Sequence, residues 1–317
     1  MEKKKRKTVY KGTKLSWKRD FKRNWPVYVL FLPIFIYQLV LHYFPMFGIV
    51  MAFENFNPVK GYFGSEWVGF DNFRTLFTGS EFLTAIRNTI CIGLINNTIG
   101  FCLPIIFAFL LTSLRNRKYK RTIQTFSYLP NFVAAVVVCA LVREFLAADG
   151  PITLLLSKVF GLPEQNWVAN ESIPIFWVIL LLMGAWQGIG WGSIMYVAAI
   201  STVSGDLHEA AAIDGATRFQ RLTKITLPCI MPTIVMMFII GIGTSFSVGG
   251  DNILLLYMPS TYKVADTVST YTYRMAFSTG SNYGLSSASG LFQSIVCSVM
   301  LLGSNYISKK KSNMSLF

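Results

Sequence analysis

Long apolar runs separated by short polar segments dominate this sequence. Six of them reach the length of about twenty residues that a helix needs to cross the hydrocarbon core of a bilayer. Their only charged side chains are Arg87, Arg143 and Glu144, each within four residues of an end, where it can reach the headgroups. The runs are 27–52, 86–112, 123–146, 174–200, 229–249 and 287–307. This pattern predicts an all-α integral membrane protein, with a membrane domain of six transmembrane helices over residues 27–307.

Composition and charge agree with this fold class and predict an orientation. Hydrophobic residues make up 53% of the 317 residues and charged residues only 14%, little more than half the usual share in soluble domains. The connecting segments on one side carry 22 Lys and Arg residues, and those on the other side carry 5. Basic residues stay preferentially on the cytoplasmic side, so both termini of this multi-pass chain are predicted to be cytoplasmic. The basic segments are 1–26, 113–122, 201–228 and 308–317.

The basic N-terminal segment has two interpretations. The Lys3–Lys7 cluster would suit contacts with nucleic-acid phosphates, but directly before a transmembrane helix such a cluster is typical of a topogenic, lipid-binding segment. Trp17, Phe21 and Trp25 recur every four residues among the charges, which indicates a helix over 14–25 in the headgroup layer. We therefore expect contact with membrane lipids and none with nucleic acid.

The cytoplasmic segment 201–228 has the sequence of two short helices joined by a break. Asp206 can cap the first helix, and Gly215 can end it in the left-handed conformation that glycine adopts at little cost. A second, amphipathic helix follows, and Pro228 suits the first turn of the next membrane helix. The segment is predicted to form an elbow that projects from the membrane.

The first helix of this elbow offers an acid, Glu209, beside small alanines that let another protein approach closely. The order Glu-Ala-Ala, three residues, Gly, nine residues, Ile-x-Leu-Pro resembles the EAA loop in permease subunits of binding-protein-dependent ABC importers. The matching positions are Glu209, Ala210, Ala211, Gly215, Ile225, Leu227 and Pro228.

Other stretches are similar to the LplB-type carbohydrate permeases of this family, and the similarity covers nearly the whole chain after residue 24. They include Pro45-Met46-Phe47-Gly48, Gly69-Phe70-Asp71-Asn72-Phe73, Trp186-Gln187-Gly188-Ile189-Gly190-Trp191, Tyr271-Thr272-Tyr273-Arg274 and Gly290-Leu291-Phe292. The resemblance implies the fold of type I importers, in which a preceding helix wraps five core helices.

The resemblance also implies partners and a location. A second, related permease would complete the translocation pathway, because two cytoplasmic ATPases need two docking sites and this chain supplies one elbow. An extracellular solute-binding lipoprotein would deliver a carbohydrate, an oligosaccharide in many relatives. Glu209 and the Ala210/Ala211 pair would bear the ATPase contact, and Gly215 would set the angle between the two short helices. ATP would bind to the partners, so no cofactor is expected on this chain. The implied location is the bacterial plasma membrane.

The fourth run is the richest in polar and aromatic side chains, which are costly in a membrane unless they face protein or water. Trp186, Gln187, Trp191 and Tyr196 are the candidates for the substrate pathway, because sugar rings stack on aromatic rings and their hydroxyls bond to amides. Packing at the interface or between helices is the alternative explanation. Asn96, Asn97, Asn131, Gln293 and Asn305 rank lower, with hydrogen bonding between helices as their expected role.

The sequence also favours transport over chemistry. No Gly-x-x-x-x-Gly-Lys-Ser/Thr motif occurs, and the five cysteines lack the spacing of a metal site or a disulfide framework. His42 and His208 are the only histidines and lie far apart. An ion-coupled secondary carrier is the main alternative, although no convincing internal repeat supports it. A membrane-embedded glycosyltransferase is a third hypothesis, but the clustered acids that it would need are absent. The chain is expected not to be an enzyme.

Overall fold

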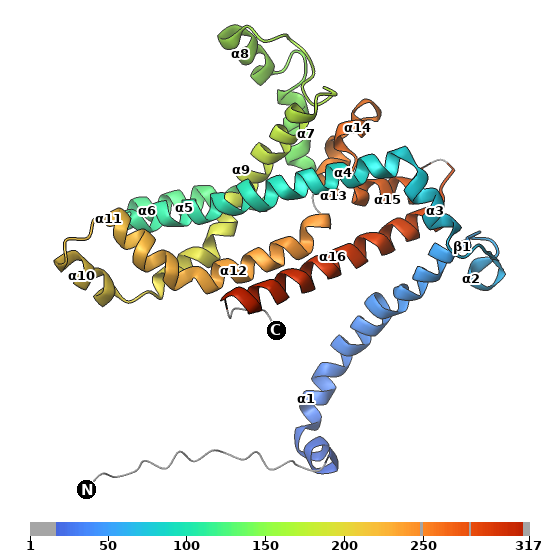
Figure 1. Ribbon diagram of the computed structural model, residues 1–317, viewed down its shortest axis with the longest axis horizontal. Helices are drawn as coiled ribbons and strands as arrows, with labels where there is room; N and C mark the ends of the chain where they lie inside the picture. Colours follow the sequence, from blue (N-terminus) through green and yellow to red (C-terminus); the bar gives the residue numbers. More distant parts are fainter. Residues whose placement is uncertain (1–16, 248–249, 279, 313–317) are drawn as a thin grey trace. The chain divides into compact units, whose positions relative to one another are not determined.

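The computed structural model describes residues 17–247, 250–278 and 280–312, and helices make up most of it (Figure 1). In this part of the chain, five helices are long and apolar enough to cross a membrane, and two further helices make a sixth span that is bent. The prediction of an all-α membrane fold with six spans is confirmed. The five helices are Asp20–Phe53, Ser80–Ser113, Ile173–Ser201, Arg218–Thr244 and Tyr283–Lys310, and the bent pair is Arg117–Phe132 with Ala135–Phe145.

The bent span differs from its prediction as a single helix over 123–146. Helix α6 (Arg117–Tyr128) passes into a 3₁₀ turn (Leu129–Phe132), and α7 (Ala135–Phe145) leaves at an angle of 94°. Leu129, directly before Pro130, keeps helical angles (φ −55°, ψ −44°), and the backbone leaves the helical region at Val133 and Ala134, whose ψ angles are 127° and 139°. Apolar side chains continue across this break, so hydropathy alone cannot detect it.

The chain divides into two compact units, Met1–Val50 and Met51–Phe317. The first unit contains α1 (Trp17–Gln38), in which Asn24 leaves the helical conformation with φ −111° and ψ 16°. This kink lies close to the predicted junction between the interfacial segment and the first span. The Lys3–Lys7 cluster, residues 14–16 of the predicted interfacial helix and residues 313–317 of the tail lie outside the described residues.

In the second unit, the membrane helices pack along one another. Helix α5 (Phe101–Ser113) packs against α9 (Ile173–Ser201), and α12 (Leu227–Thr244) packs against α16 (Tyr283–Ser312). Helices α6 and α9 approach so closely at Gly190 that a Cβ there would lie 2.0 Å from the Ser127 carbonyl oxygen. Glycine therefore lets the two backbones touch, as small residues commonly do between membrane helices.

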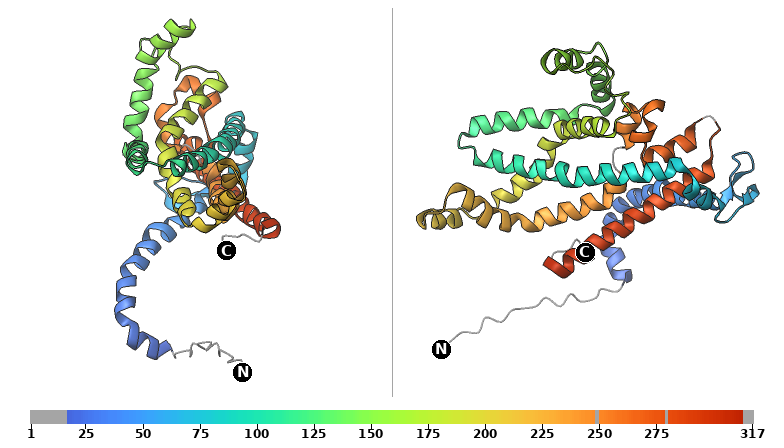
Figure 2. Two further views of the ribbon diagram at one scale, coloured as in Figure 1. Left: turned by 90° about the vertical axis from the view of Figure 1, so that its left-hand side faces the viewer. Right: turned by 45° about the horizontal axis from the view of Figure 1, so that its top comes forward.

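The connections of the second unit lie toward opposite ends of the packed helices. The elbow helices α10 (Gly205–Ile213) and α11 (Arg218–Arg221) lie at the same end as the connection between α5 and α6 (Figures 1 and 2). Helices α3 (Asp71–Thr78) and α15 (Val268–Phe277) lie toward the other end. The elements not yet named are η1 (Leu39–Tyr43), η2 (Phe44–Phe53), β1 (Glu54–Asn55), α2 (Gly61–Gly64), β2 (Glu66–Trp67), α4 (Ser80–Ile95), η3 (Asn96–Gly100), α8 (Pro151–Phe160), η5 (Leu222–Thr226), η6 (Ser245–Ser247), α13 (Gly250–Leu256), η7 (Pro259–Thr261) and α14 (Tyr262–Ala265).

Candidate functional site

Helix α10 starts the elbow, and a serine caps it. The Ser204 side-chain oxygen accepts a hydrogen bond from the Asp206 backbone N–H at 3.2 Å. The prediction of Asp206 as the cap is therefore wrong. Asp206 lies in the first turn, where its negative charge interacts favourably with the helix dipole and stabilises α10. Serine and aspartate are comparable N-caps, so the residue types alone do not distinguish the two positions.

The end of α10 is a tight turn that requires glycine. The Gly215 N–H donates to the Ala212 carbonyl at 3.2 Å, and the Ala216 N–H donates to the Ala211 carbonyl at 2.8 Å, the two bonds of a Schellman motif. Gly215 has φ +78°, and nothing lies within 4 Å of a Cβ built on it. The requirement is therefore one of backbone conformation and not of space. The predicted left-handed conformation of Gly215 is confirmed.

The second half of the elbow is joined to the fifth span without a break. A capping box between Thr217 and Gln220 starts α11, and the helix then continues through a π turn, η5, into α12. In this turn the Leu227 N–H donates a hydrogen bond to the Leu222 carbonyl, five residues earlier. The next residue, Pro228, has no N–H and cannot donate such a bond. Pro228 sits in the first turn of α12 as expected, but the second elbow helix is the start of the span.

The surface of the elbow is exposed and partly apolar. Glu209 and Ala210 are exposed, and Ala211 is half-buried. Ile213 and Phe219 have 87% and 75% of their surface exposed, which is unusual for side chains of this size outside a membrane. Such a surface is suited to contact with another protein.

A groove of about 410 Å³ separates the two halves of the elbow. It brings together three of the predicted residues, Ala211, Gly215 and Ile225, while Leu227 is half-buried and Pro228 exposed. Polar side chains missed by the sequence prediction also contribute to this groove. The full lining is Ala211, Asp214, Gly215, Ala216, Gln220, Arg221, Lys224 and Ile225.

Two polar contacts hold the halves of the elbow together. The Arg221 guanidinium donates through Nη1 to the His208 carbonyl at 3.5 Å, and the His208 ring Nε2 lies 3.4 Å from the Thr226 hydroxyl. Thr226 is buried in the π turn. His208 therefore links the first elbow helix to the base of the fifth span.

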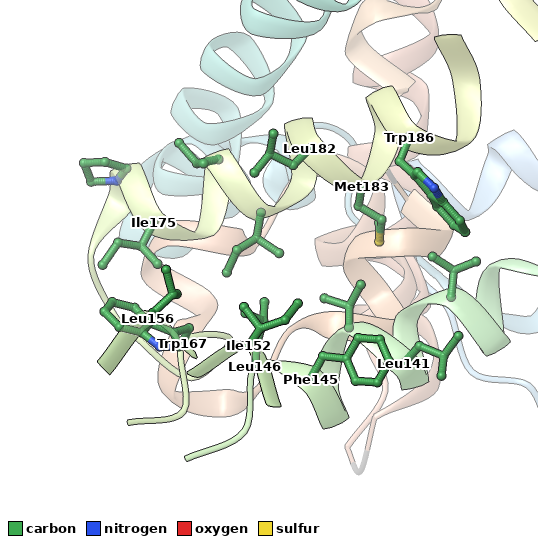
Figure 3. A pocket seen from close by; sticks show the side chains of 15 residues that line it. Leu141, Phe145, Leu146, Ile152, Leu156, Trp167, Ile175, Leu182, Met183 and Trp186 are labelled. Carbon is green, nitrogen blue, oxygen red and sulfur yellow. The ribbon is translucent and has the colours of Figure 1, made fainter. Parts of the chain in front are cut away.

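The four pathway candidates of α9 lie in different surroundings. Gln187 donates through Nε2 to the Val133 carbonyl at 3.5 Å, and the Trp191 ring meets Phe132 edge-on at 5.7 Å, so both reach the bend between α6 and α7. Trp186 lines an apolar groove beside α7 and α8 (Figure 3). Tyr196 is buried with its ring 6.4 Å from that of Phe101. Gln187 and Trp191 therefore share the bend as a neighbour, whereas the side chains of Trp186 and Tyr196 lie in other surroundings.

A notch of about 240 Å³ lies between α9, the π turn η3 and the start of α5, and among the residues that line it Asn96 has the one polar side chain. Gly184 and Gly188 form part of one wall, and no atom lies within 4 Å of a Cβ built on either. Asn96 lies opposite, although its sequence position ranked it below the aromatic candidates. Asn97 and Gln293 make the hydrogen bonds expected of them, to Ser245 and Ser269. The paired glycines of α9 were the signal that could have revealed the notch.

A network of ion pairs and hydrogen bonds joins α14 and α15 to α4. Arg274 bonds through Nη2 to Asp266 at 2.6 Å and through Nη1 to Glu81 at 3.1 Å. The Thr270 hydroxyl donates to Asp266 at 2.6 Å, and the Asn88 amide donates to the Asp266 carbonyl at 2.9 Å. We call these five residues the outer clamp. It ties the connection before the sixth span to the start of the second span.

Burial dominates the electrostatics of the outer clamp. Asp266 is 3% exposed, and the loss of water raises the pKa of its carboxyl above the ordinary 3.8, although Thr270 and Arg274 act in the opposite direction. Burial likewise raises the pKa of Tyr257 to about 12. Among the described residues, no three His, Cys, Asp or Glu side chains gather in a way that could hold a metal ion.

Comparisons with known proteins identify the family of this chain. Residues 100–311 match the family described as binding-protein-dependent transport system inner membrane component. Protein LplB of Bacillus subtilis is 37% identical over 307 residues, 96% of this chain and 95% of the relative. The polygalacturonan/rhamnogalacturonan transport system permease protein YteP of the same organism is 36% identical over 90% of this chain and 88% of the relative.

A solved structure has the same fold. One chain of a bacterial alginate ABC transporter, crystallised with an alginate pentasaccharide-bound periplasmic protein, is 37% identical with a TM-score of 0.86. The match covers 95% of this chain and 99% of that one. The relatives are transport permeases and not enzymes. Sequence and fold together show that this chain belongs to the inner membrane components of binding-protein-dependent transport systems, as an ABC importer permease.

Proposed function

We propose that this chain forms half of the translocation pathway of an ATP-driven importer for oligosaccharides. Two similar proteins support the substrate class: YteP is named for polygalacturonan and rhamnogalacturonan, and the transporter of similar fold was crystallised with an alginate pentasaccharide. A second permease would supply the other half of the pathway, and an extracellular binding protein would deliver the sugar, as the periplasmic protein of the alginate transporter suggests.

The elbow would be the point at which cytoplasmic ATPases act on this permease. The observation that carries this proposal is the geometry of residues 204–228, a capped and glycine-terminated helix whose acid, alanine and apolar side chains are exposed. Its position agrees, because it lies at the same end as the basic connection between α5 and α6 (Figure 1). That end would be cytoplasmic, with both chain termini, in a bacterial plasma membrane.

The sugar route would pass along α9 on the side of Gln187 and Trp191. These residues offer an amide and an aromatic ring beside the bend of the third span, and the notch at Asn96, Gly184 and Gly188 lies on the same helix. The surroundings of Trp186 and Tyr196 favour packing roles. On this proposal, Trp191→Ala lowers uptake but leaves ATPase binding intact.

The importer proposal is tested on the complex that the full-length chain forms in its own membrane. The tagged chain should co-purify with a subunit that carries the Gly-x-x-x-x-Gly-Lys-Ser/Thr motif and hydrolyses ATP. Glu209→Lys should remove this subunit and ATP-coupled uptake of an oligosaccharide, while the chain itself stays in the membrane. Glu171→Lys, which changes an exposed acid before α9, is the matched control and should alter neither.

Two results would contradict the proposal at different levels. ATP-coupled uptake at the wild-type rate in Glu209→Lys would exclude the elbow as the coupling contact. Uptake by the wild-type chain that requires an ion gradient and no ATPase would exclude the ATP-driven mechanism and favour a secondary carrier. Family membership gives that alternative no support.

A further inference from the structure

A carbon-lined groove lies between α7, α8 and the first half of α9 (Figure 3). Its volume is about 720 Å³, within the range of sites that bind small molecules. Phe145 of α7, Ile152 and Leu156 of α8 and Leu182 of α9 are among the side chains that line it. A sugar would find few hydrogen-bond partners there, so the groove is unsuited to the transported substrate.

One polar atom in this groove lacks a partner. Trp167 lines the groove, and its indole Nε1–H is buried without a hydrogen-bond acceptor. Its backbone is fixed, because the Trp167 N–H bonds to the Leu146 carbonyl at 3.0 Å at the end of α7. A buried indole N–H usually has an acceptor, and leaving one unpaired costs free energy. The groove is therefore suited to an apolar ligand that carries one acceptor.

The outer face of α8 indicates what surrounds the groove. Leu155, Val159 and Phe160 point away from the lining and have 58%, 63% and 69% of their surface exposed. A helix with apolar side chains on both faces is unfavourable in water but stable in a bilayer. We therefore expect α8 to lie among lipids, and the groove behind it opens toward them.

The lining residues argue against a second polypeptide as the occupant. Helices in membranes pack through small residues, as α6 and α9 do at Gly190. No Gly, Ala, Ser or Thr lines this groove, whose walls are large branched, sulfur-containing or aromatic side chains with one proline. Such an irregular apolar space suits a flexible hydrocarbon chain.

We propose that the groove binds an acyl chain of a membrane phospholipid, whose ester carbonyl accepts a hydrogen bond from the Trp167 indole. The lipid fills the space between α8 and α9, and its polar head lies beyond Trp167. Trp167 and Trp186 lie toward opposite ends of the groove, so the chain extends from the indole of Trp167 toward Trp186 (Figure 3).

The test measures lipid retained by the complete transporter, purified in mild detergent and analysed by native mass spectrometry. The added probes are palmitoyl-oleoyl phosphatidylcholine and its diether analogue, which lacks ester carbonyls. The wild-type complex should retain the ester lipid roughly 2- to 10-fold more tightly, the ratio expected for one net hydrogen bond. Trp167→Phe keeps the ring but removes the N–H, so this preference should disappear.

A second pair of variants tests the groove itself. Leu182→Trp fills the lining and should displace the bound lipid, whereas Leu155→Trp makes the same substitution on the outer face of α8 and should retain it. Equal retention in these two variants, or no lipid on the wild-type chain, would overturn the proposal. Failure of Leu182→Trp to assemble with the second permease, with no lipid on the wild type, would instead identify a polypeptide in the groove.

Discussion

The elbow and the outer clamp are both built from polar connections between membrane helices, yet their side chains are used in opposite ways. In the outer clamp, Asp266 is buried and bonded to Arg274 and Thr270 within the same chain. In the elbow, Glu209 and Phe219 are exposed to the surroundings. The clamp satisfies its polar groups internally, whereas the elbow leaves a polar and apolar surface available to a partner.

This difference predicts two kinds of mutant. Removing a partner inside the clamp leaves a buried charge uncompensated and destabilises the fold itself. Changing the exposed surface of the elbow costs the isolated chain little and acts on the complex. A clamp variant should therefore lower Tm. An elbow variant should lower ATP-coupled uptake at a nearly constant Tm.

The largest expected effect on stability is that of Arg274→Leu. Asp266 would stay buried without its ion-pair partner, so the free energy of unfolding should fall by about 3–5 kcal/mol. The measurement is the Tm of the purified complex in detergent. Glu81→Gln is the control, because Glu81 is 66% exposed and its pair with Arg274 is worth less than about 1 kcal/mol. An equal fall in Tm for Arg274→Leu and Glu81→Gln would contradict the view that the buried charge of Asp266 causes the loss.

Gly215→Pro should have the largest effect on coupling. Proline cannot adopt φ +78° and removes the N–H that bonds to Ala212, at a local cost of about 3 kcal/mol. Uptake and ATPase co-purification should be lost, while Tm stays close to that of the wild type.

Gly215→Asn provides the matched control for this prediction. Asparagine tolerates the left-handed conformation and has open space for its Cβ, so most of the uptake should remain. A large fall in Tm with Gly215→Pro would show that the elbow supports the fold as the clamp does.

A smaller effect is expected from pH. The folded-state pKa of Asp266 is raised above 3.8, so the stability gained from its bound proton is present below that value and is lost as pH rises through the raised pKa. Asp266→Asn cannot titrate, and its Tm should therefore depend less on pH across this window. A pH profile of Tm for both proteins tests this, and identical profiles would contradict it.

The smallest effect is predicted for the cap of α10. Ser204→Ala removes the hydrogen bond to the Asp206 N–H and should destabilise α10 by about 1 kcal/mol. Hydrogen exchange of the α10 amides should become several-fold faster. Asp206→Ala keeps the cap and should have less effect, so the opposite order would restore Asp206 as the capping residue.

The sequence predicted the membrane spans and the elbow because each leaves a local pattern. A run of apolar residues indicates a span, and Gly215 indicates a left-handed turn. Both signals are local and do not depend on contacts with distant residues. The bend at Val133 was missed because apolar residues flank it on both sides, and Ser204 because two adequate caps lie close together. Such choices depend on the energies of competing local structures.

The outer clamp and the notch were missed for a different reason. Asp266 and Arg274 are eight residues apart in the sequence. The contribution of their ion pair to stability depends on the burial of Asp266 against α4, nearly 180 residues earlier. Asn96 likewise gains a role only from the glycines of α9 across the notch. Contacts between distant segments leave no periodic signal in a single sequence.

The unbroken helix from Arg218 to Thr244 has a mechanical consequence. At a rise of 1.5 Å per residue its 27 residues extend about 40 Å, roughly the thickness of a bilayer with its headgroups. On the function that we propose, this helix would connect the ATPase contact to the far side of the membrane without an intervening loop. A displacement of Phe219 would then be passed along the continuous helix, and the π turn before Pro228 is the point at which the hydrogen-bond pattern of that helix changes.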